Sequence, residues 1–253
     1  MTAAWSGDVL GPVLRGIEAV VFDTDGVITD SAKVHAAAWK TAFDTYLAEH
    51  PPEDVAQRRP FDPGDDYLRY VDGKSRLDGA AAFLASRGLD PTEPIVRAVA
   101  ADKERLFTER LREHGVDAFS GTVRLVRALR AAGVPVAAAS ASRHARELLT
   151  GADVLDLFEV LVDGGEAVRL GLEGKPRPDL FLEAARRLGV PPARAAVVED
   201  ALAGVEAGSR GGFGLVVGVD RAVGPDTRDR LLRHGAHIVV HDLEELLDEE
   251  GRR

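Results

Sequence analysis

Short apolar runs and amphipathic segments alternate along most of the chain. Buried strands are predicted at residues 19–22, 134–139, 195–198, 215–219 and 238–240. Helices are predicted between them, at residues 123–132, 143–149, 179–188, 202–207 and 227–233. Continuously apolar strands that alternate with helices are typical of a parallel sheet covered on both faces. The pattern therefore predicts an α/β fold with a doubly wound, mostly parallel sheet.

Residues from about 31 to 116 break this alternation. They carry helical patterns joined by loops rich in proline and aspartate, and they contain no convincing buried strand. A helical domain inserted after the first strand explains this break. We expect an α/β catalytic core formed by residues 1–33 and 116–253, and an α-helical cap domain formed by residues 34–115.

Composition and charge exclude several classes of function. The chain has 253 residues, a formal net charge of −10 and no cysteine. Without a basic stripe, this charge repels nucleic acid and anionic lipid, and the lack of thiols excludes disulfides and thiolate chemistry. No apolar run approaches the roughly 20 residues of a membrane helix, and residues 1–16 lack the pattern of a signal peptide. We expect a cytoplasmic protein without nucleic-acid or membrane partners, and nothing in the sequence demands more than a monomer.

Polar residues follow three of the predicted strands. They are Asp23 and Asp25 after the first strand, Ser140 after the second, and Glu199 with Asp200 after a later one. Lys175 lies just before the helix that leads into that later strand. Ligands of an open parallel sheet bind at the carboxyl ends of the strands, near the point where strand order reverses. We therefore expect these side chains to meet in one site.

Carboxylates that meet in one site favour binding of a cation. Two unit charges about 4 Å apart interact by roughly 4 kcal/mol at an effective dielectric constant of about 20, so bare carboxylates destabilise one another. Mg²⁺ takes oxygen ligands and binds through a few carboxylates together with substrate phosphate. The sequence predicts a Mg²⁺ site formed by Asp23, Asp25, Glu199 and Asp200.

The same residues are suited to phosphoryl transfer. Asp23 can attack phosphorus and form an aspartyl phosphate, which divides a difficult displacement into two easier steps. Asp25, two residues further on, can act as general acid and general base at the leaving or entering oxygen. Ser140 and Lys175 can hold the equatorial oxygens of the phosphoryl group and offset the developing charge.

These motifs, in this order, resemble those of the haloacid dehalogenase superfamily of phosphotransferases. Asp23-Thr24-Asp25-Gly26 resembles its first motif and Ser140 its second, while Lys175 resembles the third and Glu199-Asp200 the fourth. The resemblance covers nearly the whole chain, from residue 19 to about residue 247. It implies a Rossmann-like core with an inserted helical cap, and a Mg²⁺-dependent enzyme that acts through an aspartyl phosphate.

Further positions resemble the β-phosphoglucomutase subfamily. They are residues 25–32, His35, Trp39, residues 73–76 and Lys103. In that subfamily the cap arginine and lysine, here Arg76 and Lys103, hold the distal phosphate of a sugar bisphosphate, and the histidine matching His35 couples cap closure to proton transfer. The resemblance implies interconversion of β-glucose 1-phosphate and glucose 6-phosphate through a bisphosphate intermediate. The predicted substrate-binding residues are His35, Trp39, Gly73, Arg76, Lys103, Ser142 and His144.

Four positions depart from the subfamily pattern. His144 stands where an asparagine usually touches phosphate, and Glu104 replaces an asparagine next to the cap lysine. Gly79 replaces a serine that can contact substrate, and Asp72 stands where a lysine is common. These departures leave the general chemistry intact but leave the sugar open.

Structural interpretations compete with the functional ones at several positions. Ser140 can start a helix, Glu199 can act as a group behind Asp200, and His35 and Trp39 can serve packing alone. At the level of function, a sugar-phosphate phosphatase of the same fold is the alternative to a mutase. A non-catalytic phospho-receiver module is a remote alternative, because such a module needs neither Asp25 nor a large helical insertion.

Overall fold

The computed structural model describes residues 9–221, 226–248 and 251, and its centre is a parallel sheet. The six strands lie in the order β3-β2-β1-β4-β5-β6, and every neighbouring pair is parallel. Their bounds are β1 Ala19–Phe22, β2 Val136–Ala139, β3 Val160–Val162, β4 Ala195–Glu199, β5 Leu215–Val219 and β6 Ile238–Val240. The predicted doubly wound sheet is confirmed, with the strand order reversing between β1 and β4.

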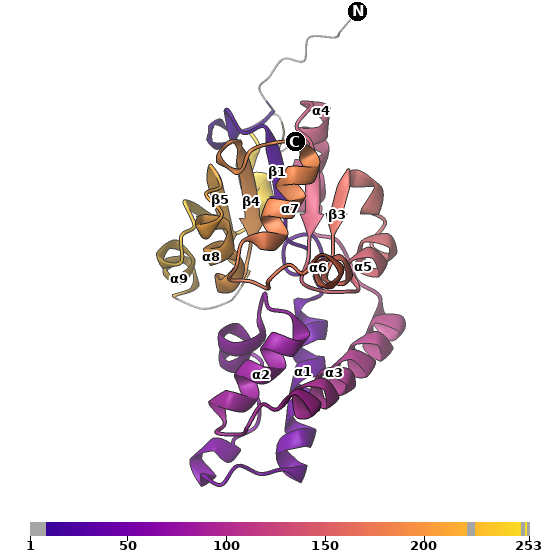
Figure 1. Ribbon diagram of the computed structural model, residues 1–253. Coiled ribbons are helices and arrows are strands. Elements are labelled where there is room, and N and C mark those ends of the chain that lie inside the picture. The colour runs from indigo at the N-terminus through magenta and orange to yellow at the C-terminus, as the bar shows by residue number, and fades with distance from the viewer. Residues whose placement is uncertain (1–8, 222–225, 249–250, 252–253) are drawn as a thin grey trace, which may run out of the picture.

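Helices cover both faces of this sheet and form a separate group below it (Figure 1). The helices of the core are α4 Ser120–Ala131, α5 Ala145–Gly151, α6 Gly164–Leu170, α7 Asp179–Leu188, α8 Leu202–Arg210 and α9 Thr227–Arg233. The lower group contains α1 Ala32–Glu49, α2 Arg76–Ser86 and α3 Glu93–His114, with the short π-helical turn η3 Tyr67–Val71 before α2.

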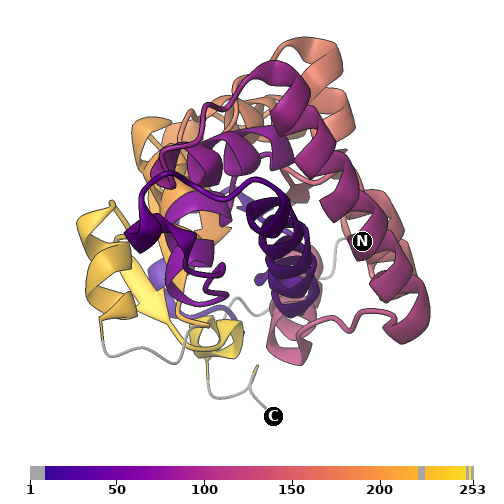
Figure 2. The same cartoon turned by 90° about the horizontal axis from the view of Figure 1, so that it is seen from below.

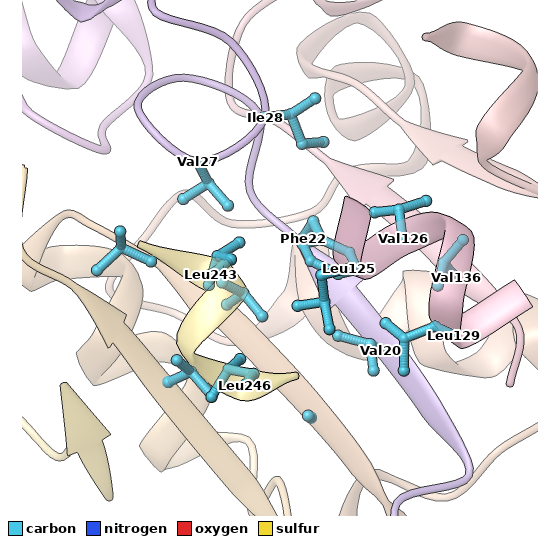
Figure 3. Packing of buried hydrophobic residues seen from close by; sticks show 14 of the residues in the cluster. Val20, Phe22, Val27, Ile28, Leu125, Val126, Leu129, Val136, Leu243 and Leu246 are labelled. Carbon is cyan, nitrogen blue, oxygen red and sulfur yellow. The ribbon is translucent and has the colours of Figure 1, made fainter. Parts of the chain in front are cut away.

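Strand β1 shows why an uninterrupted apolar run forms the middle of the sheet. Val20 and Phe22 pack on one face with Leu125 and Leu129 of α4, as Figure 3 shows. The alternate residues Ala19 and Val21 pack on the other face, in a cluster with residues of α7, α8 and α9. Both faces are therefore buried, which is why the strand has no polar position.

One strand was not predicted from the sequence. β3 has only three residues, and two of them, Val160 and Leu161, are only partly buried because the strand lies at the edge of the sheet. This apolar run is too short for a strand to be distinguished from a loop that also contains apolar residues. The predicted strand at 134–139 begins two residues later, at Val136, since Pro135 stands before it.

The lower group of helices forms a cap with its own core. Helices α1 and α3 lie side by side, as Figure 2 shows from below. Aromatic rings pack in the core of the cap between these helices and α2. The rings of Phe43 and Phe83 lie 4.0 Å apart, and Trp39 stacks on Phe43 at 4.7 Å. Every described residue between 32 and 114 is in a helix, turn or loop, in agreement with the predicted helical insertion.

The cap and the core share a small apolar contact beside the sheet's carboxyl edge. Ala38 of α1 and Phe107 of α3 are buried together with Leu148 of α5. The boundary predicted at residues 34–115 stays a prediction, and the cap helices extend from Ala32 to His114. Within the part of the chain that the structure describes, no helix is both long and apolar enough to cross a membrane, and residues 1–8 of the predicted leaderless N-terminus lie outside that part.

Candidate active site

The carboxyl end of β1 places Asp23 at the point where strand order reverses. Its backbone N–H donates to the carbonyl of Val198 in the neighbouring strand β4, at 2.9 Å. The backbone then turns at Gly26, whose φ of 81° is in the left-handed region. A Cβ at Gly26 would lie 1.8 Å from Oδ2 of Asp200, so glycine is required there by both the turn and the close approach.

Lys175 joins the two strand ends through its ammonium group. The side chain is buried, and Nζ donates to Oδ1 of Asp23 at 2.5 Å and to Oε2 of Glu199 at 2.7 Å. Burial alone would lower the pKa of Lys175, but the two carboxylates outweigh burial and raise it. Lys175 is therefore a fixed positive charge, although 152 residues separate it from Asp23 in sequence.

Three carboxylates gather around this single lysine. Asp23, Glu199 and Asp200 each offer an oxygen within 4.8 Å of the others. Burial and the charge of Asp23 raise the pKa of Glu199 to about 8. Burial is also the main reason why the pKa values of Asp23 and Asp200 are raised, with repulsion from Asp25 at Asp23 and from Asp72 and Glu199 at Asp200. The site thus holds more negative charge than its own cation neutralises.

This donor set fits Mg²⁺. The ligands are oxygen atoms only, and they converge from the ends of β1 and β4. Burial and, after it, repulsion between carboxylates raise their pKa values. A divalent cation would remove that repulsion and would leave positions for water and phosphate oxygens. Asp23 and Asp200 are the residues placed to hold the ion, with Glu199 sharing its second oxygen with the backbone N–H of Ala201.

The carboxylate of Asp25 is not part of this group of three, and its predicted role as a metal ligand stays a prediction. It accepts a short hydrogen bond from Ser31, and its oxygens lie 3.2 Å from Nε2 of His35 and 3.5 Å from Oγ of Ser140. Asp25 thus contacts Ser31 and His35 at the start of the cap's first helix. Burial raises the pKa of Asp25, but the contacts with His35 and Ser31 outweigh burial and lower it, so the group is a carboxylate at neutral pH.

His35 and Lys103 form a buried pair behind Asp25. Nζ of Lys103 donates to Nδ1 of His35 at 2.7 Å, which leaves Nε2 as the protonated nitrogen facing Asp25. The imidazole stacks on Phe107 at 4.1 Å, and burial followed by the charge of Lys103 lowers the pKa of His35. Burial also lowers the pKa of Lys103, to about 8. Lys103 thus holds His35, and His35 in turn contacts Asp25.

The loop after β2 brings a chain of hydroxyl groups to the site. Ser140 is fully buried, and its Oγ accepts from the backbone N–H of Ser142 at 3.1 Å. Oγ of Ser142 in turn accepts from the backbone N–H of His144 at 3.2 Å. These contacts fix the loop after β2, and the predicted contact of Ser140 with phosphate stays a prediction.

A cavity between core and cap is lined by most of the predicted site residues, and Ser140, Lys175 and His144 are not among its lining residues. Asp23, Asp25 and Asp200 line it from the core, and Arg76 and Lys103 line it from the cap. His35, Trp39, Gly73 and Ser142 also line it. Trp39 does so while its ring stacks in the cap's aromatic core, and at Gly73 an added Cβ would lie 2.7 Å from that of Ala201, so the cap touches the core there.

Two acidic side chains in this cavity were noted from the sequence only as departures from a pattern. Asp72 projects from the cap toward the core carboxylates, and burial together with the charge of Asp23 raises the pKa of Asp72 to about 7. Glu104 lies next to Lys103 and bonds to both Arg76 and His144. Their neighbours are distant in sequence, so only the fold reveals these contacts.

The fold and the site together define a phosphoryl-transfer enzyme with a helical cap. The profile of the haloacid dehalogenase-like hydrolase family matches residues 17–212. The β-phosphoglucomutase of Mycobacterium bovis is 42% identical over 240 residues, which cover 91% of this chain and 92% of that protein. The β-phosphoglucomutase of Bacillus subtilis is 32% identical over 242 residues, covering 92% and 95%.

A solved structure agrees with these sequence matches. The crystal structure of β-phosphoglucomutase from Clostridium difficile has a TM-score of 0.70 and 25% identity, and the match covers 92% of this chain and 94% of that one. The chain therefore belongs to the haloacid dehalogenase-like hydrolase family, in its β-phosphoglucomutase-like branch. The family resemblance noted in the sequence is confirmed, and the protein is an enzyme.

Proposed function

We propose that this enzyme is a Mg²⁺-dependent sugar-phosphate mutase that interconverts β-glucose 1-phosphate and glucose 6-phosphate. One observation carries the proposal: the same cavity has Asp23 and Asp25 on its core side and the cations Arg76 and Lys103 on its cap side. A mutase has to place two phosphates of one sugar at opposite ends of a closed chamber. The names of the relatives at 42% and 32% identity support this choice of reaction.

The proposed cycle uses Asp23 as the phosphoryl carrier. In the phosphorylated enzyme, O6 of β-glucose 1-phosphate attacks the phosphorus, the bond to the Asp23 oxygen breaks, and Asp25 takes the O6 proton. Against burial, His35 and Ser31 lower the pKa of Asp25, so at neutral pH it is in the ionised form that a general base needs. After the bisphosphate turns over, Asp23 attacks the phosphorus on O1, Asp25 returns its proton to O1, and glucose 6-phosphate leaves.

The remaining residues of the site hold groups in place. Lys175 keeps Asp23 oriented and supplies fixed positive charge next to the transferred group. His35, itself held by Lys103, fixes the carboxylate of Asp25 in the cavity. Mg²⁺, bound at Asp23 and Asp200, would neutralise negative charge on the phosphoryl group.

The direct test is phosphorus NMR of the protein with Mg²⁺, β-glucose 1-phosphate and a trace of glucose 1,6-bisphosphate. The proposal predicts a glucose 6-phosphate signal that grows with the loss of β-glucose 1-phosphate, at constant inorganic phosphate. The α-anomer in a parallel sample is the control and should stay unchanged. Release of inorganic phosphate without glucose 6-phosphate would overturn the mutase assignment.

A phosphatase acting on small sugar phosphates is the second candidate. The observation that favours it is the pairing of Arg76 with Glu104, at 2.7 Å, which leaves less positive charge for a second phosphate. In that case water rather than a sugar hydroxyl would attack the phosphoaspartate. The same NMR experiment separates the two, because only the phosphatase forms inorganic phosphate at the rate at which substrate disappears.

A further inference from the structure

Glu104 lies at the centre of a charged cluster that bridges the cap and the core. Its Oε2 accepts from Nη1 of Arg76 at 2.7 Å, and its Oε1 lies 2.6 Å from Nε2 of His144. Arg76 begins α2 and Glu104 belongs to α3, whereas His144 stands at the start of α5 in the core. One carboxylate therefore holds two cap helices and one core helix together.

The basic groups of this cluster could bind an anion, and the carboxylate of Glu104 already occupies them. Arg76, Lys103, Glu104 and Arg143 all line the cavity that also contains Asp23. Burial raises the pKa of Glu104, but the hydrogen bonds from His144 and Arg76 outweigh it and lower the pKa to about 2. The hydrogen bond with Glu104 is also the main reason why the pKa of His144 is raised. At neutral pH, Glu104 is thus ionised between the guanidinium of Arg76 and the imidazole of His144, and it favours the protonated form of that imidazole.

A phosphate at this end of the cavity needs the donors that Glu104 occupies. Guanidinium and imidazolium N–H groups are preferred partners of phosphate oxygens, and Arg76 reaches phosphate best when both edges of its fork are available. Two anions on the same donors repel each other, so phosphate has to displace the carboxylate. Glu104 lies about one quarter exposed, which gives it room to move.

We propose that Glu104 is an internal competitor for the distal phosphate: its carboxylate occupies Arg76 and His144 in the absence of substrate and lowers the affinity for a second phosphate. This inference rests on the proposed function for the identity of the ligand. In this role Glu104 is a specificity-determining residue, because it weakens binding of doubly phosphorylated sugars without touching the phosphate at Asp23. It also links release of the distal phosphate to renewed contact between cap and core.

Glu147 provides a matched control on the other side of the same histidine. Its Oε2 lies 2.9 Å from Nδ1 of His144, but it is half exposed and has no contact with Arg76 in the described residues. Replacing Glu147 by Gln therefore removes one carboxylate from His144 and leaves the pair between Arg76 and Glu104 in place. Only Glu104→Gln removes the carboxylate from both Arg76 and Nε2 of His144.

The test measures binding in the Asp23→Asn background, which cannot form the aspartyl phosphate. Three full-length proteins are compared by calorimetry in Mg²⁺: Asp23→Asn alone, with Glu104→Gln, and with Glu147→Gln. The ligands are glucose 1,6-bisphosphate and para-nitrophenyl phosphate, which has one phosphate and no anionic distal group. We expect Glu104→Gln to lower the Kd of the bisphosphate by about tenfold, or about 1.4 kcal/mol, and to leave that of the monoester within about twofold. Glu147→Gln should change neither by more than about twofold.

The outcomes separate this inference from the proposed function. If Glu104→Gln leaves the bisphosphate affinity unchanged or weakens it, Glu104 is only a support for Arg76 and His144, and the inference is wrong. Equal tightening of both ligands would also contradict it, since it would show a general charge effect. If wild-type protein fails to form glucose 6-phosphate while Glu104→Gln still tightens bisphosphate binding selectively, the mutase assignment fails and the competitor role stands.

Discussion

Two buried charge clusters, one in the cap and one in the core, differ in their balance. In the cap, Asp66 is fully buried and accepts from Arg87 at 2.6 Å and from Arg59 at 2.7 Å. In the core, Lys175 is the partner of Asp23 and Glu199, with Asp200 close by. The first cluster has at least as many positive as negative charges, whereas the second has an excess of carboxylates.

The pKa values follow this difference. Burial raises the pKa of Asp66, but Arg59, the backbone N–H of Asp62 and Arg87 together lower it. In the core, burial and neighbouring carboxylates raise the pKa of Glu199 to about 8 in spite of Lys175. A balanced cluster stabilises the fold, while an unbalanced one stores repulsion that a bound cation relieves. We therefore assign a structural role to the cluster around Asp66 and a catalytic role to the cluster around Lys175.

The largest effect is expected from Asp200→Asn. This change removes one of the carboxylates that hold the cation, and we expect kcat/KM to fall by at least about a thousandfold, or about 4 kcal/mol. Without metal, the same variant should unfold at an equal or higher urea concentration than wild type, because Asp200 is repelled by its neighbours. Steady-state kinetics and urea titrations measure the two effects. A metal-free variant much less stable than wild type would show that Asp200 is a structural residue.

The balanced cluster should respond in the opposite way to Asp66→Asn. This change leaves Arg87 buried without a carboxylate, and we expect the free energy of unfolding to fall by about 3–5 kcal/mol. Arg97→Ala, which breaks the exposed pair with Glu93, is the control and should change it by less than about 1 kcal/mol. Denaturant unfolding followed by circular dichroism measures both. The kcat of the folded fraction should be retained, and its loss would contradict the structural role.

Mg²⁺ should stabilise the core cluster selectively. At a concentration of about 100 times its Kd, an ion that binds only the folded state adds about 2.7 kcal/mol to the free energy of unfolding. Asp200→Asn should lose most of this gain, and Asp66→Asn should keep it. Thermal unfolding with and without Mg²⁺ provides the measurement. An equal gain in all three proteins would place the ion elsewhere.

The smallest effect concerns pH in the absence of metal. Glu199 binds its proton more tightly in the folded state, with a pKa of about 8 against an ordinary 4.5, so stability is lost as pH rises through this range. The coupled carboxylates titrate as a group, and we expect a loss on the order of 1–2 kcal/mol between about pH 5 and pH 8. Asp66 has the opposite sign, since its contribution is lost only as pH falls below its ordinary 3.8. Urea titrations in chelator at several pH values measure the slope, which Mg²⁺ should flatten. A metal-free stability that rises over this range would contradict the excess of negative charge.

The sequence predicts the sheet well because burial on both faces leaves a clear apolar signal. Val20, Val21 and Phe22 could be assigned to a strand since each meets a helix on one face or the other. β3 could not, because an edge strand of three partly buried residues carries little signal. The meeting of Asp23, Lys175 and Glu199 follows from the rule that parallel strands end at one edge.

Side-chain direction and cap contacts were beyond the sequence. Asp25 was predicted as general acid and base and as a metal ligand, but the sequence could not show that its carboxylate contacts Ser31 and His35. The contact of Glu104 with His144 depends on how α3 docks against the start of α5, and no local pattern encodes that docking.

Peptide mapping of the phosphoenzyme tests the central claim that the unbalanced cluster makes Asp23 a phosphoryl carrier. The enzyme is mixed with Mg²⁺ and glucose 1,6-bisphosphate, quenched in acid within the first turnover, digested and examined by mass spectrometry. We predict phosphate on the peptide that contains Asp23, and none when Mg²⁺ is chelated or in Asp23→Asn. Phosphate on a different residue, or full turnover without any phosphorylated peptide, would contradict the account.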